Sequence, residues 1–183
     1  MLAGGRSRRF GADKTRLTVG GEGIVARAVR IFREAGFVRI WIIGGKDPGV
    51  PGAEHLPDRH PGVLGPSEGV ATALDRVEEG CFAVAADMPA LSVPLVKAVL
   101  EAWDGRSSAA APRIDGRWEP LCALYARCAL PVMEKAAREG TSLQKILTEF
   151  PAQEVELAEE LRAGLLNVNT LEEWKRYQVE SRK

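Results

Sequence analysis

Short apolar runs alternate with segments of helical periodicity along most of this chain. Cys81–Ala86 is a run of six apolar residues, and Val38–Ile43 is a second strand-like run that ends at two glycines. Apolar residues recur at intervals of three and four in residues 24–35 and 70–79, which predicts helices there. Strands that alternate with helices favour a three-layer α/β fold with a mainly parallel sheet. The length of 183 residues allows a single domain spanning residues 1–183.

Capping and turn residues set the expected boundaries of later elements. Ser92 is expected to cap one helix, and Thr141-x-x-Gln144 has the spacing of a capping box that opens another. Strands are predicted over 108–111 and 121–126, with an Asp-Gly turn between them. The α/β pattern therefore continues through the second half of the chain.

Composition excludes several classes of protein. Lys and Arg together number 25, as do Asp and Glu, and this balance argues against a general nucleic-acid binder that must neutralise many phosphates. No apolar stretch approaches the ~20 residues that a membrane span needs. The chain has three cysteines without a C-x-x-C pair and only two histidines, which indicates reduced thiols and excludes a multi-histidine metal site. We therefore expect a cytoplasmic protein with no nucleic-acid partner and no membrane partner.

The positive charge is concentrated at the start of the chain. Residues 1–16 hold five cations against a single aspartate, a local net charge of +4. Adjacent glycines let backbone N–H groups approach an anion, and arginines match the geometry of phosphate oxygens. The candidate phosphate ligands are Gly4, Gly5, Arg6, Arg8, Arg9 and Lys14. A solvated basic turn is the alternative, but the position directly after a predicted strand favours a polyphosphate site, although no Walker A string is present.

Carboxylates and amides mark other expected strand ends and turns. Asp87 closes the apolar run Cys81–Ala86, and its carboxylate is a hard oxygen ligand suited to Mg²⁺, unless it serves as a turn or capping residue. Asp58 follows a short extended piece and could equally be a turn residue. Asn167 and Asn169 precede a predicted helix cap, where they could recognise a substrate or simply form a turn. Because ligands bind beyond the carboxyl ends of parallel strands, we expect the basic loop, Asp58 and Asp87 at one edge of the sheet.

Taken in order, these motifs resemble the molybdenum cofactor guanylyltransferases, the MobA family of nucleotidyltransferases. The segments that carry the resemblance are Leu2–Lys14, similar to L-A-G-G-x-S-x-R-M-G-x-D-K with Phe10 for Met; Gly65-Pro66…Gly69, similar to G-P-x-x-G; Ala86–Pro89, similar to C-D-M-P; Pro120–Tyr125, similar to P-L-x-A-L-Y; and Asn167–Thr170, similar to N-V-N-T. The chain departs from the family at Ala86, where relatives have Cys, and at Gly44, where relatives often have Asn. The matching segments span nearly the whole chain.

The resemblance implies an enzyme with a Rossmann-like nucleotidyltransferase fold. It implies transfer of GMP from Mg·GTP to the terminal phosphate of molybdopterin, which forms the guanine dinucleotide form of the molybdenum cofactor and releases pyrophosphate. The residues expected to contact GTP are Leu2, Ala3, Gly4, Gly5 and Lys14, with Asp58 beside the nucleotide, Asp87 on Mg²⁺, and Asn167 and Asn169 on the pterin side. Catalysis is expected to rest on the cations Arg6, Arg8, Arg9 and Lys14 together with Asp87.

Two other functions stay open on the sequence alone. A cytidylyl- or sugar-nucleotidyltransferase would have the same fold, although such enzymes often carry L-A-A-G where this chain has Ala3-Gly4-Gly5. A GTP-binding module without turnover is the second alternative, and the carboxylate of Asp87 counts against it. The expected partners are GTP and molybdopterin, with molybdoenzyme apoproteins or their chaperones as candidates to receive the product.

Overall fold

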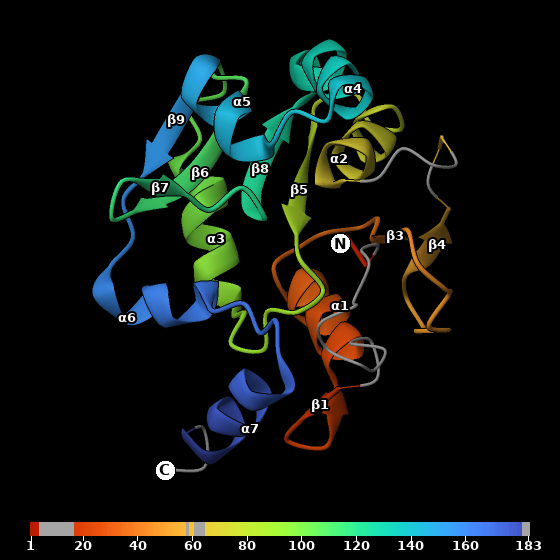
Figure 1. Ribbon diagram of the computed structural model, residues 1–183, viewed down its shortest axis with the longest axis vertical. Helices are drawn as coiled ribbons and strands as arrows, with labels where there is room; N and C mark the ends of the chain where they lie inside the picture. The colour runs from red at the N-terminus through yellow and green to blue at the C-terminus, as the bar shows by residue number, and fades with distance from the viewer. Residues whose placement is uncertain (4–16, 58, 61–64, 181–183) are drawn as a thin grey trace.

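The structure is a computed structural model that describes residues 1–3, 17–57, 59–60 and 65–180 (Figure 1). Its strands are β1 (Thr18–Val19), β2 (Glu22–Gly23), β3 (Trp41–Ile43), β4 (Glu54–Leu56), β5 (Gly80–Val84), β6 (Ala109–Ile114), β7 (Arg117–Trp118), β8 (Cys122–Ala126) and β9 (Ala152–Val155). Its α-helices are α1 (Ile24–Glu34), α2 (Pro66–Leu74), α3 (Val93–Ala102), α4 (Leu130–Glu139), α5 (Leu143–Glu149), α6 (Glu159–Arg162) and α7 (Leu171–Glu180). None of these described helices is long and apolar enough to cross a membrane.

The first three residues join two groups of strands. Leu2 forms parallel bridges to Ile43 of β3 and to Ala85, just after β5. On the β3 side, β4 pairs in parallel with β3. On the β5 side, β8 runs antiparallel to both β5 and β6, while β9 is parallel to β6. The order across the sheet is therefore β4, β3, residues 1–3, β5, β8, β6 and β9, with β7 paired antiparallel to the far end of β6.

The sheet is mixed and not clearly parallel as predicted, because β8 is antiparallel to both of its neighbours while β3, β4, β5 and residues 1–3 run parallel. A parallel connection needs a crossover of about a dozen residues or more, usually with a helix. Only residues 115–121 separate β6 from β8, and β7 lies within that stretch. The chain therefore reverses direction in a hairpin, with Asp115 at a φ of 49° and Gly116 at 77°, and the sheet is mixed.

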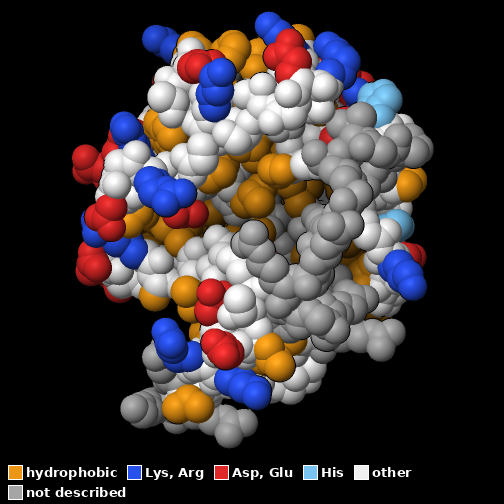
Figure 2. All heavy atoms as spheres, viewed as in Figure 1, with side chains coloured by type: hydrophobic (Ala, Val, Ile, Leu, Met, Phe, Trp, Pro, Cys, Tyr) orange, Lys and Arg blue, Asp and Glu red, His pale blue; other side chains and the backbone are white. Residues whose placement is uncertain are grey.

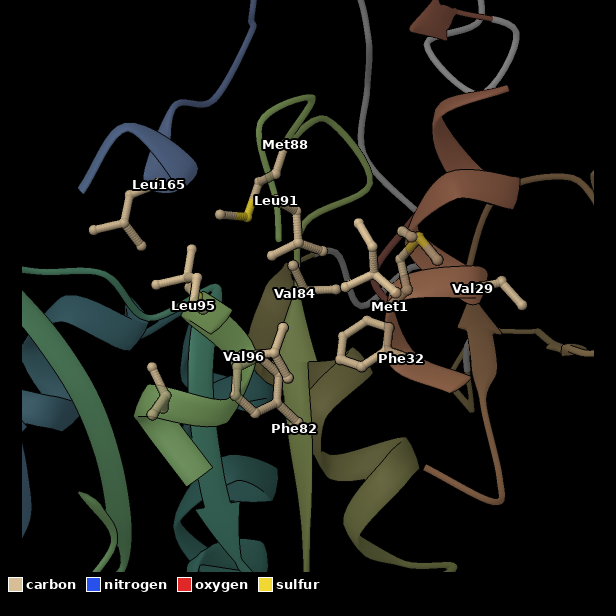
Figure 3. Close-up of a cluster of buried hydrophobic side chains, with 14 of the residues drawn as sticks. Met1, Val29, Phe32, Phe82, Val84, Met88, Leu91, Leu95, Val96 and Leu165 are labelled. Atoms are coloured by element: carbon tan, nitrogen blue, oxygen red, sulfur yellow. The ribbon is translucent and has the colours of Figure 1, made fainter. Parts of the chain in front are cut away.

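Helices cover both faces of the sheet, and alternate residues of the central strand show this directly. Phe82 and Val84 of β5 pack into the same buried cluster as Phe32 of α1 and Val96 of α3 (Figure 3). Ala83, between them, packs into a second cluster formed with α2, α4 and α5. The three-layer α/β arrangement that the sequence predicts is therefore present.

The helix caps follow the sequence prediction at one site and differ at another. The Ser92 hydroxyl accepts a hydrogen bond from the Leu95 N–H at 3.4 Å, which confirms the predicted cap of α3. In α5 the cap is Ser142, one residue later than predicted. The Gln144 side chain does not complete a capping box, because it hydrogen-bonds both the N–H and the C=O of Trp118. A tertiary contact has replaced the local one.

Cys122, the first residue of β8, and Cys128, two residues after its end, differ in environment and should differ in reactivity. Cys122 is fully buried, and burial raises the pKa of its thiol to about 12, whereas Cys128 is exposed. Because the thiolate is the nucleophile, we expect N-ethylmaleimide at neutral pH to modify Cys128 in the native protein and to spare Cys122 until denaturant is added. Peptide mass spectrometry would measure this, and equal native labelling of the two thiols would contradict the buried position of Cys122.

Candidate functional site

The carboxyl ends of the parallel strands meet at one edge of the sheet. The Leu2 N–H donates to the Val84 C=O at 2.8 Å, and the Leu2 C=O accepts from the Ala86 N–H at 3.1 Å. The Ala3 N–H donates to the Ile43 C=O at 2.9 Å on the other side. This short strand therefore places the start of the glycine loop between the ends of β3 and β5.

Asp87 follows β5 at the same edge, and its side chain is half-buried. The backbone C=O of Asp87 accepts a hydrogen bond from the Val168 N–H at 3.0 Å. Val168 is fully buried and stands between the two asparagines of the N-V-N-T segment. The fold thus brings this late segment beside Asp87, although about eighty residues of sequence separate them.

The two asparagines present different groups at this edge. Asn167 donates its side-chain amide to the Leu165 C=O at 3.3 Å, while its Oδ1 atom is buried and has no hydrogen-bond partner among the described residues. The Asn169 side chain is exposed, and its backbone N–H donates to Glu173 at 2.6 Å. The helix cap expected after Asn169 is present: the Thr170 hydroxyl accepts from the Glu173 N–H at 3.1 Å, and the Glu173 carboxylate accepts from the Thr170 N–H at 3.1 Å. A buried acceptor without a partner is a suitable contact for a ligand donor.

Several predicted site residues lie outside the described part of the chain. They are Gly4, Gly5, Arg6, Arg8, Arg9, Lys14 and Asp58. Leu2, Ala3, Asp87, Asn167 and Asn169 are described. The structure joins Leu2 and Ala3 to the end of β5, and it joins Asp87 to the asparagine segment. The roles of all these residues stay predictions.

Among the described residues, a metal ion at this site would have one carboxylate ligand, that of Asp87, and would take its other ligands from a bound phosphate. Among them, no three His, Cys, Asp or Glu side chains gather into a cluster that could hold an ion. Mg²⁺ commonly binds through one or two carboxylates and completes its shell with substrate phosphates and water. Asp87, at the carboxyl end of β5, suits this kind of site, which forms together with a nucleotide.

A surface depression and a separate cavity lie at opposite ends of β5. Figure 2 shows a depression with hydrophobic side chains on its floor, beside the carboxyl end of β5. A separate cavity of about 200 Å³ opens at the amino ends of β3 and β5, where Phe32, Phe37 and Phe82 line it. Because Asp87 lies at the other end of β5, this aromatic cavity takes no part in the candidate site.

Two acidic residues near the site were not singled out from the sequence. Glu119 precedes β8 at the same edge, and burial raises the pKa of its carboxyl group. Glu68 lies in the first turn of α2 and is only 2% exposed. A charged residue inside an otherwise small and apolar helical segment, residues 65–74, was the available signal for Glu68.

Comparison with known proteins identifies similar sequences over almost the whole chain. Residues 1–156 match the profile of the family described as "MobA-like NTP transferase domain". The chain is 34% identical to a probable molybdenum cofactor guanylyltransferase from Opitutus terrae, over 94% of this chain and 90% of that protein. It is 30% identical to a molybdenum cofactor guanylyltransferase from Xanthomonas euvesicatoria, over 96% of this chain and 91% of that protein.

Solved structures agree with this comparison. The molybdopterin-guanine dinucleotide biosynthesis protein A from Archaeoglobus fulgidus superimposes with a TM-score of 0.78 and 25% identity. The superposition covers 100% of this chain and 97% of that chain, so the two proteins share a fold.

Proposed function

This chain belongs to the family of MobA-like NTP transferase domains, and from that premise we propose that it is a molybdenum cofactor guanylyltransferase. The reaction transfers GMP from Mg·GTP to the terminal phosphate of molybdopterin. An oxygen of the acceptor phosphate bonds to the α-phosphorus of GTP, the bond from that phosphorus to the β-phosphate oxygen breaks, and pyrophosphate leaves. The observation that carries the proposal is the full-length similarity to guanylyltransferases, supported by the position of Asp87 at the carboxyl end of β5.

In this proposal the start of the chain binds the nucleotide. Leu2, Ala3, Gly4 and Gly5 would present backbone groups to GTP, and Asp58 would help to hold it. The cations Arg6, Arg8, Arg9 and Lys14 would neutralise the phosphates and stabilise the pyrophosphate as it leaves. Because two anionic substrates must approach each other, this positive charge lowers the repulsion between them.

The other side of the site would hold the metal and the acceptor. Asp87 would bind Mg²⁺, which when bound supplies Lewis-acid polarisation of the α-phosphate. Asn167 and Asn169 would contact the pterin, and the buried Oδ1 atom of Asn167 supports this assignment. The acceptor is already an anionic phosphate, so no side chain is needed as a general base.

Pyrophosphate release with a panel of nucleotides tests the function. We expect turnover with GTP when molybdopterin and Mg²⁺ are both present, and no turnover when any of the three is left out. ATP, CTP and UTP with molybdopterin, and a sugar 1-phosphate with GTP, complete the panel. Equal turnover with CTP, or with the sugar phosphate as acceptor, would contradict the assignment and favour another nucleotidyltransferase. Nucleotide binding without any turnover would favour a GTP-binding module.

A further inference from the structure

The short connection between β7 and β8 carries a half-buried carboxylate, Glu119, that is outside the residues assigned above. Its carboxylate makes no hydrogen bond or ion pair with the residues that the structure describes. Burial raises the pKa of this carboxyl group, and the exposed Arg117 opposes that shift by a smaller amount. A carboxylate that loses water without gaining a partner destabilises the folded protein. Binding of a ligand would account for this cost.

The backbone on both sides of this carboxylate is held by neighbouring elements. The N–H of the residue itself donates to the Pro112 C=O of β6 at 2.8 Å. The preceding residue, Trp118, has both of its backbone groups hydrogen-bonded by the Gln144 side chain of α5. The C=O of the following residue, Pro120, accepts the Tyr125 hydroxyl of β8 at 2.8 Å. A side chain without a partner thus extends from a fixed backbone, so the acceptor is positioned before a ligand binds.

This connection lies at the edge of the sheet that holds Asp87. β8 begins beside the carboxyl end of β5, because the two strands are antiparallel. The Ala85 N–H donates to the Leu121 C=O at 3.3 Å, and the Cys122 N–H donates to the Glu119 C=O at 3.1 Å. The turn that contains Glu119 therefore stands beside the residues that lead to Asp87. Figure 2 shows a depression with a hydrophobic floor at this end of β5.

The two neighbours of β5 divide this edge into two sides. Residues 1–3 pair with β5 on one side, where the Leu2 N–H donates to the Val84 C=O, and β8 pairs with it on the other. In the proposed function, residues 1–3 lead into the nucleotide-binding segment, so GTP lies on their side of Asp87. The attacking and leaving oxygens of phosphoryl transfer are roughly in line. The acceptor would therefore approach from the side of β8, where Glu119 lies.

The pterin ring of this acceptor presents donors that match a carboxylate. Its pyrimidinone ring carries a 2-amino group next to N3–H, which makes two parallel donors on one edge. A carboxylate accepts two parallel hydrogen bonds of this kind, as it does from a guanidinium group. The hydrophobic floor of the depression suits the flat face of the ring. The guanine base of GTP presents the same pair of donors at N1 and N2, so an experiment must separate the two rings.

We propose that Glu119 recognises the pterin of the acceptor, by accepting hydrogen bonds from its 2-amino group and its N3–H. This inference deepens the proposed function and rests on it. The pterin ring is remote from the phosphate that reacts, so this contact is equally strong in the ground state and in the transition state. Its loss should therefore raise the KM for the acceptor and leave kcat unchanged.

The first test compares Glu119→Gln with the wild type in the full chain. Glutamine keeps the size of the side chain but replaces one acceptor oxygen with an amide donor, which opposes the donors of the pterin. We expect the KM for molybdopterin to rise about 10–100-fold, with kcat and the Kd for Mg·GTP, measured by calorimetry, unchanged. A rise in the Kd for Mg·GTP with an unchanged KM for molybdopterin would overturn the proposal and assign the carboxylate to guanine.

A pair of ring analogues tests the contact to the 2-amino group directly. The probes are 6-hydroxymethylpterin and 6-hydroxymethyllumazine, which has an oxygen in place of that amino group. Fluorescence titration should show that the wild type binds the pterin about tenfold or more tightly than the lumazine. Glu119→Gln should lose most of this preference. A preference that is unchanged in the variant would overturn the contact.

Glu154→Gln is the matched control. Glu154 is exposed on β9, the outermost strand, where it pairs with Arg113 at 3.4 Å. Its replacement should leave the KM for molybdopterin unchanged.

Stability separates a binding role from a structural one. The melting temperature of Glu119→Gln should be unchanged or higher, because a neutral amide is less costly to bury than a carboxylate. A lower melting temperature with an unchanged KM would show a structural role and overturn the proposal. Wild-type protein that uses a sugar phosphate in place of molybdopterin would contradict the proposed function itself. Wild-type turnover with molybdopterin, together with an unchanged KM in Glu119→Gln, would overturn only the role of Glu119.

Discussion

Replacement of Asp87 by asparagine is expected to lower kcat for GMP transfer by about 10²–10³-fold, the usual effect of removing one electrostatic contact to a transition state. Asparagine keeps the size and the backbone hydrogen bond to Val168 but removes the negative charge that would bind Mg²⁺. The concentration of Mg²⁺ that gives half the maximal rate should rise in the variant. Steady-state pyrophosphate release across a Mg²⁺ titration measures both quantities.

The control for this experiment is Glu101→Gln, which removes an exposed carboxylate from α3. It should retain wild-type kcat and the wild-type Mg²⁺ requirement. Circular dichroism should show that Asp87→Asn is folded, because the side chain is half-buried and lies at the end of a strand. A folded Asp87→Asn protein with wild-type kcat would place the metal elsewhere.

Replacement of Gly80 by alanine is expected to lower the free energy of unfolding by about 3 kcal/mol, at the upper end of the usual cost of overpacking. A Cβ atom at position 80 would lie 2.6 Å from the Tyr125 carbonyl oxygen and 3.2 Å from the Ala126 Cα atom. Both are backbone atoms of β8, so no side-chain rotation can relieve the contact and the two strands must separate. The melting temperature should fall by about 6–12 °C, given the scaling for domains of this size.

Gly23→Ala is a suitable control for that variant. Gly23 precedes α1 with φ −59° and ψ 135°, angles that alanine adopts freely, and its added Cβ atom would come no closer than 4.0 Å to a neighbour, the Ala26 Cβ. This substitution should leave stability unchanged or raise it by up to about 1 kcal/mol through the unfolded state. Equal melting temperatures for Gly80→Ala and Gly23→Ala would show that β5 and β8 are not in such close contact.

The central part of the fold could be predicted from the sequence because the residues that define each element there lie within that element or next to it. The apolar run Cys81–Ala86 covers most of β5 and is followed by Asp87, and Ser92 caps the next helix, so strand, predicted site residue and helix follow in order. The predicted helix over 70–79 lies further along the chain than α2, which begins at Pro66 and ends at Leu74. Proline is well tolerated at the first position of a helix, and Pro66 is the first residue of α2.

Contacts between residues far apart in the chain could not be predicted from local sequence patterns. The direction of β8 depends on how far the chain travels between strands, and periodicity does not report this. Gln144 has the spacing of a capping residue, but its partner is Trp118, 26 positions away. Likewise nothing in the sequence around Glu68 indicates that its carboxylate accepts the backbone N–H of His60.

The contacts of the C-terminal residues determine where the chain can be truncated without loss of packing. The family profile ends at residue 156, yet Leu165, Val168 and Trp174 are buried in the cluster that contains α1 and α3. Tyr177 of α7 also donates its hydroxyl to the Pro89 C=O at 3.1 Å, two residues after Asp87. A protein fragment that ends at residue 156 would lose these contacts. During evolution, changes in α7 and in the loop after β5 should therefore be correlated, and fusions or tags are better tolerated after α7 than before it.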